Sequence, residues 1–218
     1  MCESIRIVCA LCRVGIYALY RRLCCKGPSP VRPNFSILCI GLENAGKSSI
    51  LSCLSGDDLH KIEPTIGFSI KAVLFEDCIL EVKELGGGDK VRPYWDRYYQ
   101  VFQGIIFVIA GDDSDEKLNV AREELLKAAR HHQLKGLPLL ILVSHQDKEG
   151  AKTAEEMMTF LQLGTEMENR QFLIKGCSIH NKEELSQIFA QFNEILQKNL
   201  DHDIELRKNS PQHSGNRL

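Results

Sequence analysis

Eight consecutive residues carry the types and the spacing that a phosphate-binding loop needs. Residues 41–48, GLENAGKS, fit the pattern G-x-x-x-x-G-K-[ST]. Glycines let the backbone curl until several N–H groups point inward, and a helix N-terminus adds partial positive charge. We therefore predict that Lys47 reaches the β- and γ-phosphates of a nucleotide and that the hydroxyl of Ser48 binds Mg²⁺. The predicted loop consists of Gly41, Leu42, Glu43, Asn44, Ala45, Gly46, Lys47 and Ser48.

Two further segments are expected to contribute groups to the phosphates and the metal. The hydroxyl of Thr65 is a candidate ligand of Mg²⁺, and its N–H is a candidate donor to a γ-phosphate. Glu84 stands at the end of a predicted strand, where its carboxylate can reach Mg²⁺ through water; alternatively, it points away and pairs with Lys47. The glycines that follow can bring an N–H to the γ-phosphate. This predicted segment consists of Glu84, Leu85, Gly86, Gly87 and Gly88.

A carboxylate after another predicted strand indicates guanine as the base. Asp147 can accept hydrogen bonds from N1–H and the 2-amino group of guanine, and adenine has neither donor. A buried carboxylate left unpaired against the wrong base discriminates by up to about 10⁴-fold. A backbone N–H from the pair Cys177-Ser178 is expected at guanine O6. The predicted base site consists of Ser144, His145, Gln146, Asp147, Cys177 and Ser178.

The elements that must position these groups alternate between strands and helices. Short apolar or β-branched runs predict strands, and apolar residues at helical spacing predict helices. Their order predicts an α/β fold: a six-stranded, mostly parallel sheet with helices on both faces and ligands at the carboxyl ends of the strands. The predicted strands are 35–40, 69–75, 79–85, 105–110, 137–143 and 172–174, and the predicted helices are 49–54, 116–132, 153–163 and 183–200.

Length and composition fit one folded domain with two tails. A chain of 218 residues, of which 44% are hydrophobic and 26% charged, can bury a core of ordinary size. We expect a membrane-associating segment with a proline-rich linker over 1–33, the folded domain over 34–200 and a disordered tail over 201–218. The net charge of −2 gives no reason to expect nucleic acid as a partner.

The first 33 residues are basic and apolar. They contain six Arg or Lys residues and one acid, which suits an interfacial helix on an anionic membrane surface. Arg13 interrupts the apolar run, so neither a transmembrane span nor a signal peptide is expected, and Cys2 in place of glycine argues against N-myristoylation. Cys24 and Cys25 are candidate sites of S-acylation; the alternatives are unmodified cysteines or a zinc site with the earlier cysteines. We expect the protein at the cytoplasmic face of an internal membrane or the plasma membrane, with a cytosolic pool.

Several stretches together resemble the ADP-ribosylation-factor branch of the small GTPases. They are the phosphate loop 41–48, the segments 64–68, 86–87 and 89–95, and Gln146-Asp147, in the family's order across residues 34–200. The resemblance implies the P-loop small-GTPase fold and a GTP/GDP-binding switch with Mg²⁺. It also implies two mobile loops, 57–68 and 86–100, that effector proteins read in the GTP state, and membrane association through the N-terminus. An exchange factor or activating protein is implied as well, and the sequence does not identify it.

Three motifs depart from the family's pattern. The usual Asp before the glycines is Glu84, whose extra methylene changes its reach toward Mg²⁺. The water-orienting Gln is replaced by Gly88, so slow or absent GTP hydrolysis is expected. In the guanine motif, Ser144 replaces Asn and is expected to lose contact with the base and the neighbouring loop, while the ring of His145 is expected to stack on the base in place of Lys. We expect guanine preference to be kept through Asp147, with weaker affinity.

The expected effector surface is aromatic. Phe68, Trp95 and Tyr98 are its predicted centre, because aromatic residues dominate interface hot spots. Lys83 stands where the family's hydrophobic triad has a Trp, so the family's usual effectors are not expected. The altered positions leave a second hypothesis open, a nucleotide-insensitive pseudo-GTPase scaffold or adaptor. A nucleotide or metabolite kinase is disfavoured because no segment resembles an Arg-rich lid.

Overall fold

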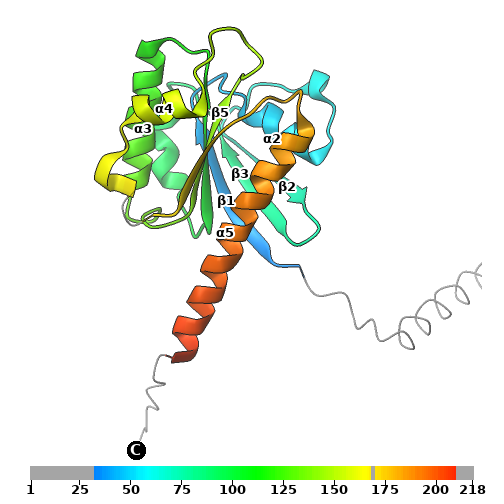
Figure 1. Cartoon of the computed structure of the whole chain (residues 1–218), viewed down its shortest axis with the longest axis vertical. Coiled ribbons are helices and arrows are strands. Elements are labelled where there is room, and N and C mark those ends of the chain that lie inside the picture. The colour runs from blue at the N-terminus through cyan, green and yellow to red at the C-terminus, as the bar shows by residue number, and fades with distance from the viewer. Residues whose placement is uncertain (1–31, 168–169, 210–218) are drawn as a thin grey trace, which may run out of the picture. The chain divides into compact units, whose positions relative to one another are not determined.

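A six-stranded sheet forms the centre of the protein (Figure 1). The structure is a computed structural model that describes residues 32–167 and 170–209, so the predicted membrane segment with Cys24 and Cys25 lies outside the described residues. The strand order is β2-β3-β1-β4-β5-β6; all neighbours are parallel except β2 and β3, which form an antiparallel hairpin. This confirms the predicted fold class. The strands are β1 (Asn34–Gly41), β2 (Phe68–Leu74), β3 (Ile79–Leu85), β4 (Gly104–Ala110), β5 (Leu139–Ser144) and β6 (Phe172–Gly176).

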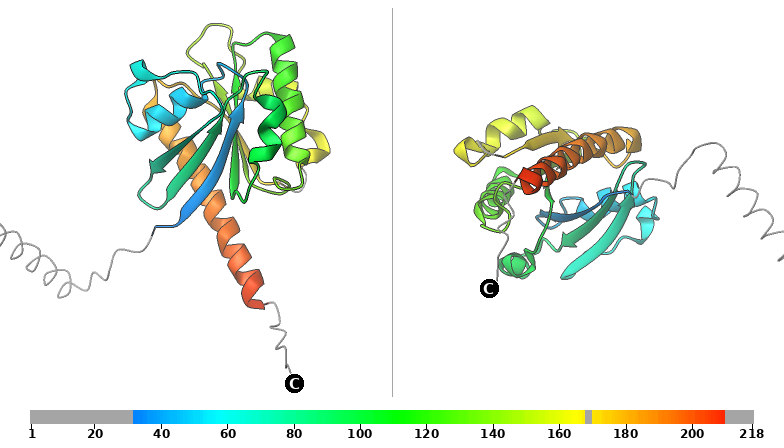
Figure 2. Two further views of the ribbon diagram at one scale, coloured as in Figure 1. Left: turned by 180° about the vertical axis from the view of Figure 1, so that it is seen from behind. Right: turned by 90° about the horizontal axis from the view of Figure 1, so that it is seen from below.

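Helices cover both faces of the sheet (Figure 2). The α-helices are α2 (Lys47–Ser55), α3 (Asp115–Arg130), α4 (Ala154–Leu161) and α5 (Lys182–Asn209), with 3₁₀ segments η1 (Leu59–Lys61), η2 (Arg92–Tyr98) and η3 (Gly164–Met167). Residues of α3 and α4 share one core cluster with Leu38 and Ile40, whereas residues of α2 and α5 share the other with Ile37 and Cys39. Residues 37–40 of β1 are four consecutive apolar residues because both faces of this part of the strand are buried.

The last helix is longer than the sequence pattern predicts. α5 runs to Asn209, whereas the sequence predicts a disordered tail over 201–218. The prediction is therefore corrected for 201–209. Residues 210–218 lie outside the described residues. The segment 201–209 contains no glycine or proline, and the next proline is Pro211, so nothing in its sequence stops the helix. Its final turns, red in Figure 2, extend beyond the sheet. Within the described ranges no helix, α5 included, is both long and apolar enough to cross a bilayer.

The carboxyl ends of the parallel strands meet at one edge of the sheet. β1, β3, β5 and β6 run in the same direction, so the segments that follow Gly41, Leu85, Ser144 and Gly176 lie along that edge. At the first of these ends the backbone passes so close to β4 that a Cβ on Gly41 would lie 2.2 Å from the carbonyl oxygen of Val108. The fold therefore brings the predicted phosphate and base segments, which are far apart in the sequence, to one place.

Candidate nucleotide-binding site

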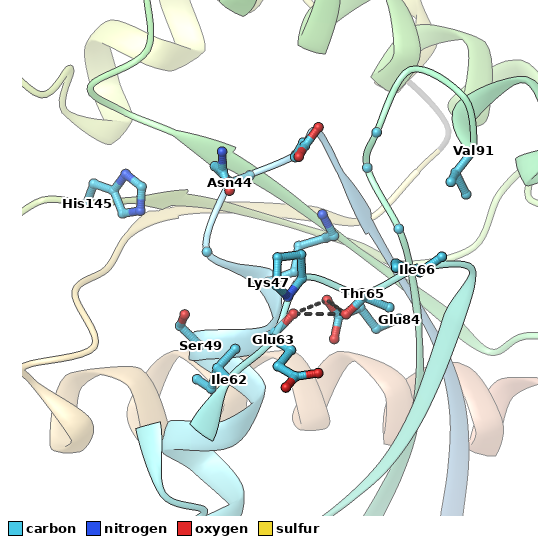
Figure 3. Close-up of a pocket in the computed structure, with 18 residues that line it drawn as sticks. Asn44, Lys47, Ser49, Ile62, Glu63, Thr65, Ile66, Glu84, Val91 and His145 are labelled. Atoms are coloured by element: carbon cyan, nitrogen blue, oxygen red, sulfur yellow. Dashed lines mark hydrogen bonds between the residues drawn. The ribbon is translucent and has the colours of Figure 1, made fainter. Parts of the chain in front are cut away.

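The phosphate loop encloses a pocket of about 400 Å³ (Figure 3). Gly46, directly before α2, has a φ of 85°, and Asn44 has a φ of 61°, so two residues take the left-handed conformation that curls the loop. Lys47 is only 6% exposed, and its Nζ donates hydrogen bonds to the carbonyls of Gly41 (2.9 Å) and Leu42 (2.8 Å). Burial lowers the pKa of Lys47. The loop thus holds a desolvated cation at the wall of the pocket.

Sequence reasoning missed part of the lining of this pocket and of the neighbouring one. The missed residues adjoin predicted ones in the chain, and that adjacency is the signal that could have found them. They are Ser49, Ile62, Glu63, Pro64, Ile66 and Val91 in the phosphate pocket and Ile50, Lys148, Ile179 and His180 in the neighbouring pocket. The predicted residues Leu42 and Leu85 instead place their side chains in the core, at 3% and 1% exposure, and can offer only backbone atoms to a ligand.

Glu84 brings a buried carboxylate to the two predicted hydroxyl ligands. Its Oε1 accepts hydrogen bonds from Ser48 Oγ (2.5 Å) and Thr65 Oγ1 (3.2 Å), and the two hydroxyls lie 3.2 Å apart (Figure 3). Glu84 is 1% exposed, and within the described residues its Oε2 has no hydrogen-bond partner. Of the two predicted orientations, this arrangement favours the one toward the metal position. One carboxylate and two hydroxyls fit Mg²⁺, which takes its remaining ligands from phosphates and water.

The three glycines after β3 have different spatial requirements. A Cβ on Gly86 would lie 2.5 Å from the carbonyl oxygen of Thr65, and one on Gly87 would lie 2.3 Å from that of Gly41. At Gly88 the nearest atom to such a Cβ is Glu43 Oε2, at an ordinary contact distance of 3.5 Å. The first two glycines are therefore required by close backbone packing, whereas the third position has room for a side chain.

A second pocket, of about 250 Å³, lies beside the phosphate loop where β5 and β6 end. Ser144, 3% exposed, donates from its Oγ to the carbonyl of Ala45 in the phosphate loop (2.7 Å), and Ile109 O lies 3.2 Å from the same Oγ. The prediction that Ser144 loses contact with the neighbouring loop is therefore wrong. Its hydroxyl is short, but β5 ends close enough to the phosphate loop for it to reach.

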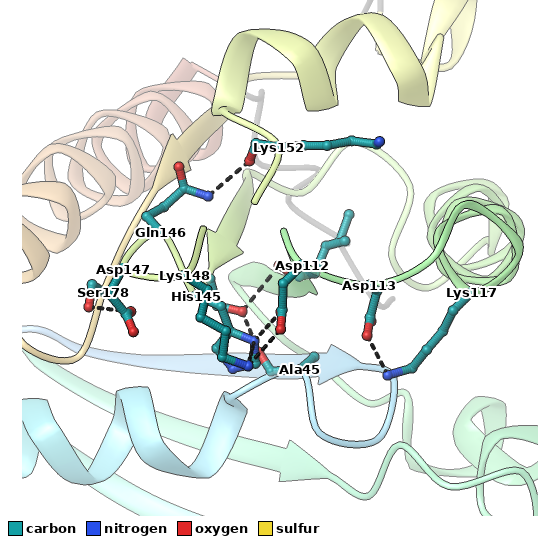
Figure 4. A network of polar contacts seen from close by, with 12 residues as sticks. Ala45, Asp112, Asp113, Lys117, His145, Gln146, Asp147, Lys148, Lys152 and Ser178 are labelled. Atoms are coloured by element: carbon teal, nitrogen blue, oxygen red, sulfur yellow. Dashed lines mark hydrogen bonds and ion pairs between the residues drawn. The ribbon is translucent and has the colours of Figure 1, made fainter. Parts of the chain in front are cut away.

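His145 forms the wall between the two pockets and is fixed by a residue that sequence reasoning missed. Its Nδ1 lies 2.5 Å from Asp112 Oδ1, and Lys148 Nζ lies 2.6 Å from Asp112 Oδ2 (Figure 4). Although burial raises the pKa of Asp112, the hydrogen bonds with Lys148 and His145 outweigh it and lower that pKa to about 2. Asp112 follows β4 at the same edge of the sheet, and this position is the signal that could have indicated its role.

Asp147 lies in the second pocket as predicted for a base-reading carboxylate. Its Oδ1 accepts a hydrogen bond from Ser178 Oγ (2.6 Å), which lowers the pKa of Asp147. The N–H of Cys177 donates to Val143 O (2.8 Å) and is thereby committed to the sheet. Gln146 differs from its prediction as a nucleotide-binding residue, because its Nε2 donates to the carbonyl of Lys152 (2.9 Å) and its side chain lines neither pocket. Gln146 instead supports the loop that carries its neighbours.

The predicted effector surface is only partly a surface. Phe68 is 49% exposed and its ring centroid lies 5.6 Å from that of Tyr98, with Lys83 Nζ 5.1 Å and 5.5 Å from the two centroids. Trp95, in contrast, is 2% exposed in the core, and its Nε1 donates to Gly86 O (2.9 Å), so its assignment to the surface is corrected. The 3₁₀ turn of η2 directs this residue inward and Tyr98 toward Phe68. The exposed group is therefore an aromatic pair with an ammonium.

A phosphate loop on the first strand of this sheet, with Thr65 and Glu84 brought to it from flanking segments, is the architecture of a small GTPase. The profile of the ADP-ribosylation factor family matches residues 29–196, and the chain belongs to that family. The resemblance found in the sequence is thus confirmed.

Relatives of the chain within the family include ADP-ribosylation factor-like protein 15 from Bos taurus, 44% identical over 187 residues that cover 86% of this chain and 91% of the relative. The protein of the same name from Homo sapiens is 43% identical over the same shares of both chains. The solved structure of the Arl6 BBS3 small GTPase from Trypanosoma brucei, with the bound nucleotide analogue GppNp, has a TM-score of 0.68 at 26% identity, covering 76% of this chain and 98% of that one.

Proposed function

We propose that this chain is a membrane-associated guanine-nucleotide switch that binds GTP or GDP with Mg²⁺ and recruits effector proteins. The observation that carries this proposal is the buried Glu84 carboxylate, joined to the hydroxyls of Ser48 and Thr65, with one oxygen unpartnered within the described residues. An unpaired buried carboxylate oxygen is unfavourable, and a cation beside it removes that penalty. The bound GppNp of the related Arl6 supports a nucleoside triphosphate in the adjacent loop.

The metal-binding residues connect one mobile loop to the rigid part of the fold. Ser48 lies in α2 and Glu84 in β3, whereas Thr65 belongs to loop 57–68 between η1 and β2. Mg²⁺, when bound, neutralises charge on the β- and γ-phosphate oxygens. Because Thr65 offers its hydroxyl to the metal position and its N–H to the γ-phosphate side, a triphosphate fixes the loop and a diphosphate releases it.

Gly86 connects the first loop, which the nucleotide fixes or releases, to the second loop, 86–100. Its N–H donates to Gly67 O (2.8 Å) in the first loop, and its carbonyl accepts from the buried Trp95 (2.9 Å). A change in the first loop therefore reaches the segment that carries Tyr98, whose ring faces Phe68. This chain of contacts links the γ-phosphate to the aromatic surface.

The second pocket supplies base recognition. Asp147 accepts from N1–H and the 2-amino group of guanine, and the Ser178 hydroxyl holds that carboxylate in place. Since the Cys177 N–H is committed to Val143, the donor to guanine O6 is the N–H of Ser178. Ser144 joins the base segment to the phosphate loop, so the pocket for the base keeps a fixed position relative to the pocket for the phosphates.

The effector that this surface suits combines apolar and acidic groups. The rings of Phe68 and Tyr98 offer apolar area, and Lys83 between them replaces a hydrophobic side chain by a cation. Capture of effector proteins from membrane extract is expected to be lost in Phe68→Ala, because this variant lacks the exposed ring. Leu74→Ala removes an even more exposed apolar side chain (68% against 49% for Phe68) at the far end of β2; it is the matched control and is expected to keep capture.

Nucleotide affinity of the full chain tests the switch directly. GDP and GTPγS are both expected to bind, and removal of Mg²⁺ by EDTA is expected to weaken GTPγS at least tenfold. Lys47→Ala is expected to lose at least about 100-fold in affinity for both nucleotides, because the desolvated phosphates lose their cation; Lys135→Ala, an exposed lysine in a turn, is the control. Binding of neither nucleotide up to millimolar concentration would overturn the proposal.

The alternative function, a nucleotide-insensitive scaffold or adaptor, is favoured by the replacements at Glu84, Gly88 and Ser144. The same capture experiment separates the two functions. Partner recovery that is equal for GDP-loaded, GTPγS-loaded and Lys47→Ala protein supports the scaffold. Recovery that rises with GTPγS supports the switch.

Membrane association through the basic segment 1–33 is part of the proposal, at the cytoplasmic face of an internal membrane or the plasma membrane with a cytosolic pool. Joint replacement of Cys24 and Cys25 by serine is expected to move the protein to the soluble fraction if both carry acyl chains. Cys12→Ser is the control, since a zinc site with the earlier cysteines would make it equally damaging. Unchanged membrane fractionation of the double variant rejects acylation at these positions.

A further inference from the structure

The room at Gly88 is bounded by a carboxylate of the phosphate loop. A Cβ at this position would have Glu43 Oε2 as its nearest neighbour, at 3.5 Å. The N–H of Glu43 donates to Gly87 O (3.2 Å), so the loop and the glycine segment are joined directly beside this carboxylate. Glu43 and Gly88 line the same pocket as Lys47 and Thr65. A side chain at position 88 would therefore extend toward the space that the Glu43 carboxylate borders.

We propose that Glu43 orients the water that attacks the γ-phosphate, in the role that a Gln at position 88 has in related switches; this inference rests on the proposed function. In that role a side chain accepts a hydrogen bond from the attacking water. The carboxylate of Glu43 can accept such a bond, and its loop lines the pocket that we propose holds the phosphates. Glu43 is thus the catalytic residue of a slow intrinsic hydrolysis.

The step is a hydrolysis without any further reactant. The water oxygen bonds to the γ-phosphorus while the bond from that phosphorus to the β–γ bridging oxygen breaks, and the electron pair stays on GDP. One water proton moves to the Glu43 carboxylate and passes to the phosphate product. Positioned acid–base groups of this kind contribute about 10² to 10⁴-fold.

The same carboxylate opposes GTP binding. Glu43 is exposed, so its repulsion of a γ-phosphate is largely screened and weakens GTP relative to GDP by about fivefold. This effect on affinity is smaller than the expected effect on rate. The two contributions can therefore be separated by measuring the rate and the affinity of the same variant.

Single-turnover hydrolysis of GTP by the full chain, followed over hours, tests the inference together with GDP and GTPγS affinities. Glu43→Ala is expected to slow hydrolysis at least tenfold, with both affinities within about fivefold of the unmodified chain. Adding Gly88→Gln to Glu43→Ala is expected to restore the rate, because position 88 has room for a side chain. Glu123→Gln, an exposed charge on α3, is the control for loss of one negative charge.

Three results would overturn this inference while leaving the proposed function intact. The first is an unchanged rate in Glu43→Ala. The second is a Glu43→Ala variant whose hydrolysis rate is unchanged and whose GTPγS affinity alone changes. The Glu43 carboxylate would then only repel the γ-phosphate and would take no part in hydrolysis. The third is an unmodified chain that binds GTP tightly and releases no phosphate. Failure to bind GTP at all would instead overturn the proposed function.

Discussion

The pocket at the phosphate loop, here called the phosphate pocket, and the second pocket, which contains Asp147 and is here called the base pocket, hold their charged groups in different ways. In the phosphate pocket Lys47 and Glu84 are 6% and 1% exposed, and they bond to backbone carbonyls and to hydroxyls of the same pocket. In the base pocket the side chain of Asp147 is 38% exposed, and that of Asp112, which contacts His145 in the pocket wall, is 24% exposed; both have ion-pair partners near the surface. Buried groups lose much when a partner is removed, whereas exposed ion pairs contribute little. Changes in the phosphate pocket should therefore weaken binding more than changes in the base pocket do.

The largest effect is expected where the two loops of the phosphate pocket touch. In Gly87→Ala the new Cβ would lie 2.3 Å from Gly41 O and 2.4 Å from Glu43 N, both backbone atoms that cannot rotate away. Overpacking costs about 1–3 kcal/mol and occasionally more, and two rigid backbone contacts place this change at the upper end, so GDP affinity should fall about 100-fold or more. Titration calorimetry of GDP measures the loss. Gly88→Ala, which meets only the end of a flexible side chain, should change affinity far less; equal losses in the two variants would contradict this account of the close approach.

Asp147→Asn should have the next largest effect and should change the specificity of the base pocket. The amide can accept one hydrogen bond but presents a donor to the 2-amino group of guanine, so GDP affinity is expected to fall about 100-fold. Xanthosine diphosphate, which has an acceptor at that position, is expected to bind the variant better than the unmodified chain does. Competition against labelled GDP measures both effects, with Asp201→Asn on α5 as the control. An unchanged guanine preference would remove Asp147 from base recognition.

Ser144→Ala tests the connection between the two pockets. The change leaves the buried carbonyl of Ala45 without its 2.7 Å donor, at a cost of about 1–3 kcal/mol. We expect the midpoint of thermal unfolding to fall by about 4 °C and GDP affinity to fall about tenfold. Ser186→Ala also removes a hydroxyl that donates to a carbonyl, that of Lys182, but at an exposed site, and should shift the midpoint by less than about 1 °C. If both variants behave alike, the Ser144 bond does not connect the pockets.

The sequence predicted the sheet, its helices and the strand-end location of the site, because periodicity and glycine positions determine these features locally. It did not predict long-range side-chain contacts. The hydroxyl of Ser144 is short, and only the end of β5 beside the phosphate loop brings it within reach of Ala45; Trp95 is an aromatic residue of a polar segment, and only the turn of η2 directs it toward Gly86. Asp112 was missed because its role depends on His145, 33 positions away. Such roles follow from tertiary distances, which residue type and local spacing do not contain.

Asp112 should give the smallest effect, and its pH dependence separates the ion pair from other contributions. Its folded pKa of about 2 is below the ordinary value of 3.8, so the unfolded chain binds more protons between these values. The stability that Asp112 contributes is therefore present above about pH 4 and is lost as the pH falls toward 2. Against Asp112→Asn, the unmodified chain should unfold about 1–3 °C higher from pH 7 to pH 5, and this difference should shrink below about pH 4 and disappear at about pH 2 and below. Because Lys148 and His145 remain in both proteins, a difference that persists undiminished at pH 2 would show that packing, not the charge of Asp112, holds the wall of the base pocket.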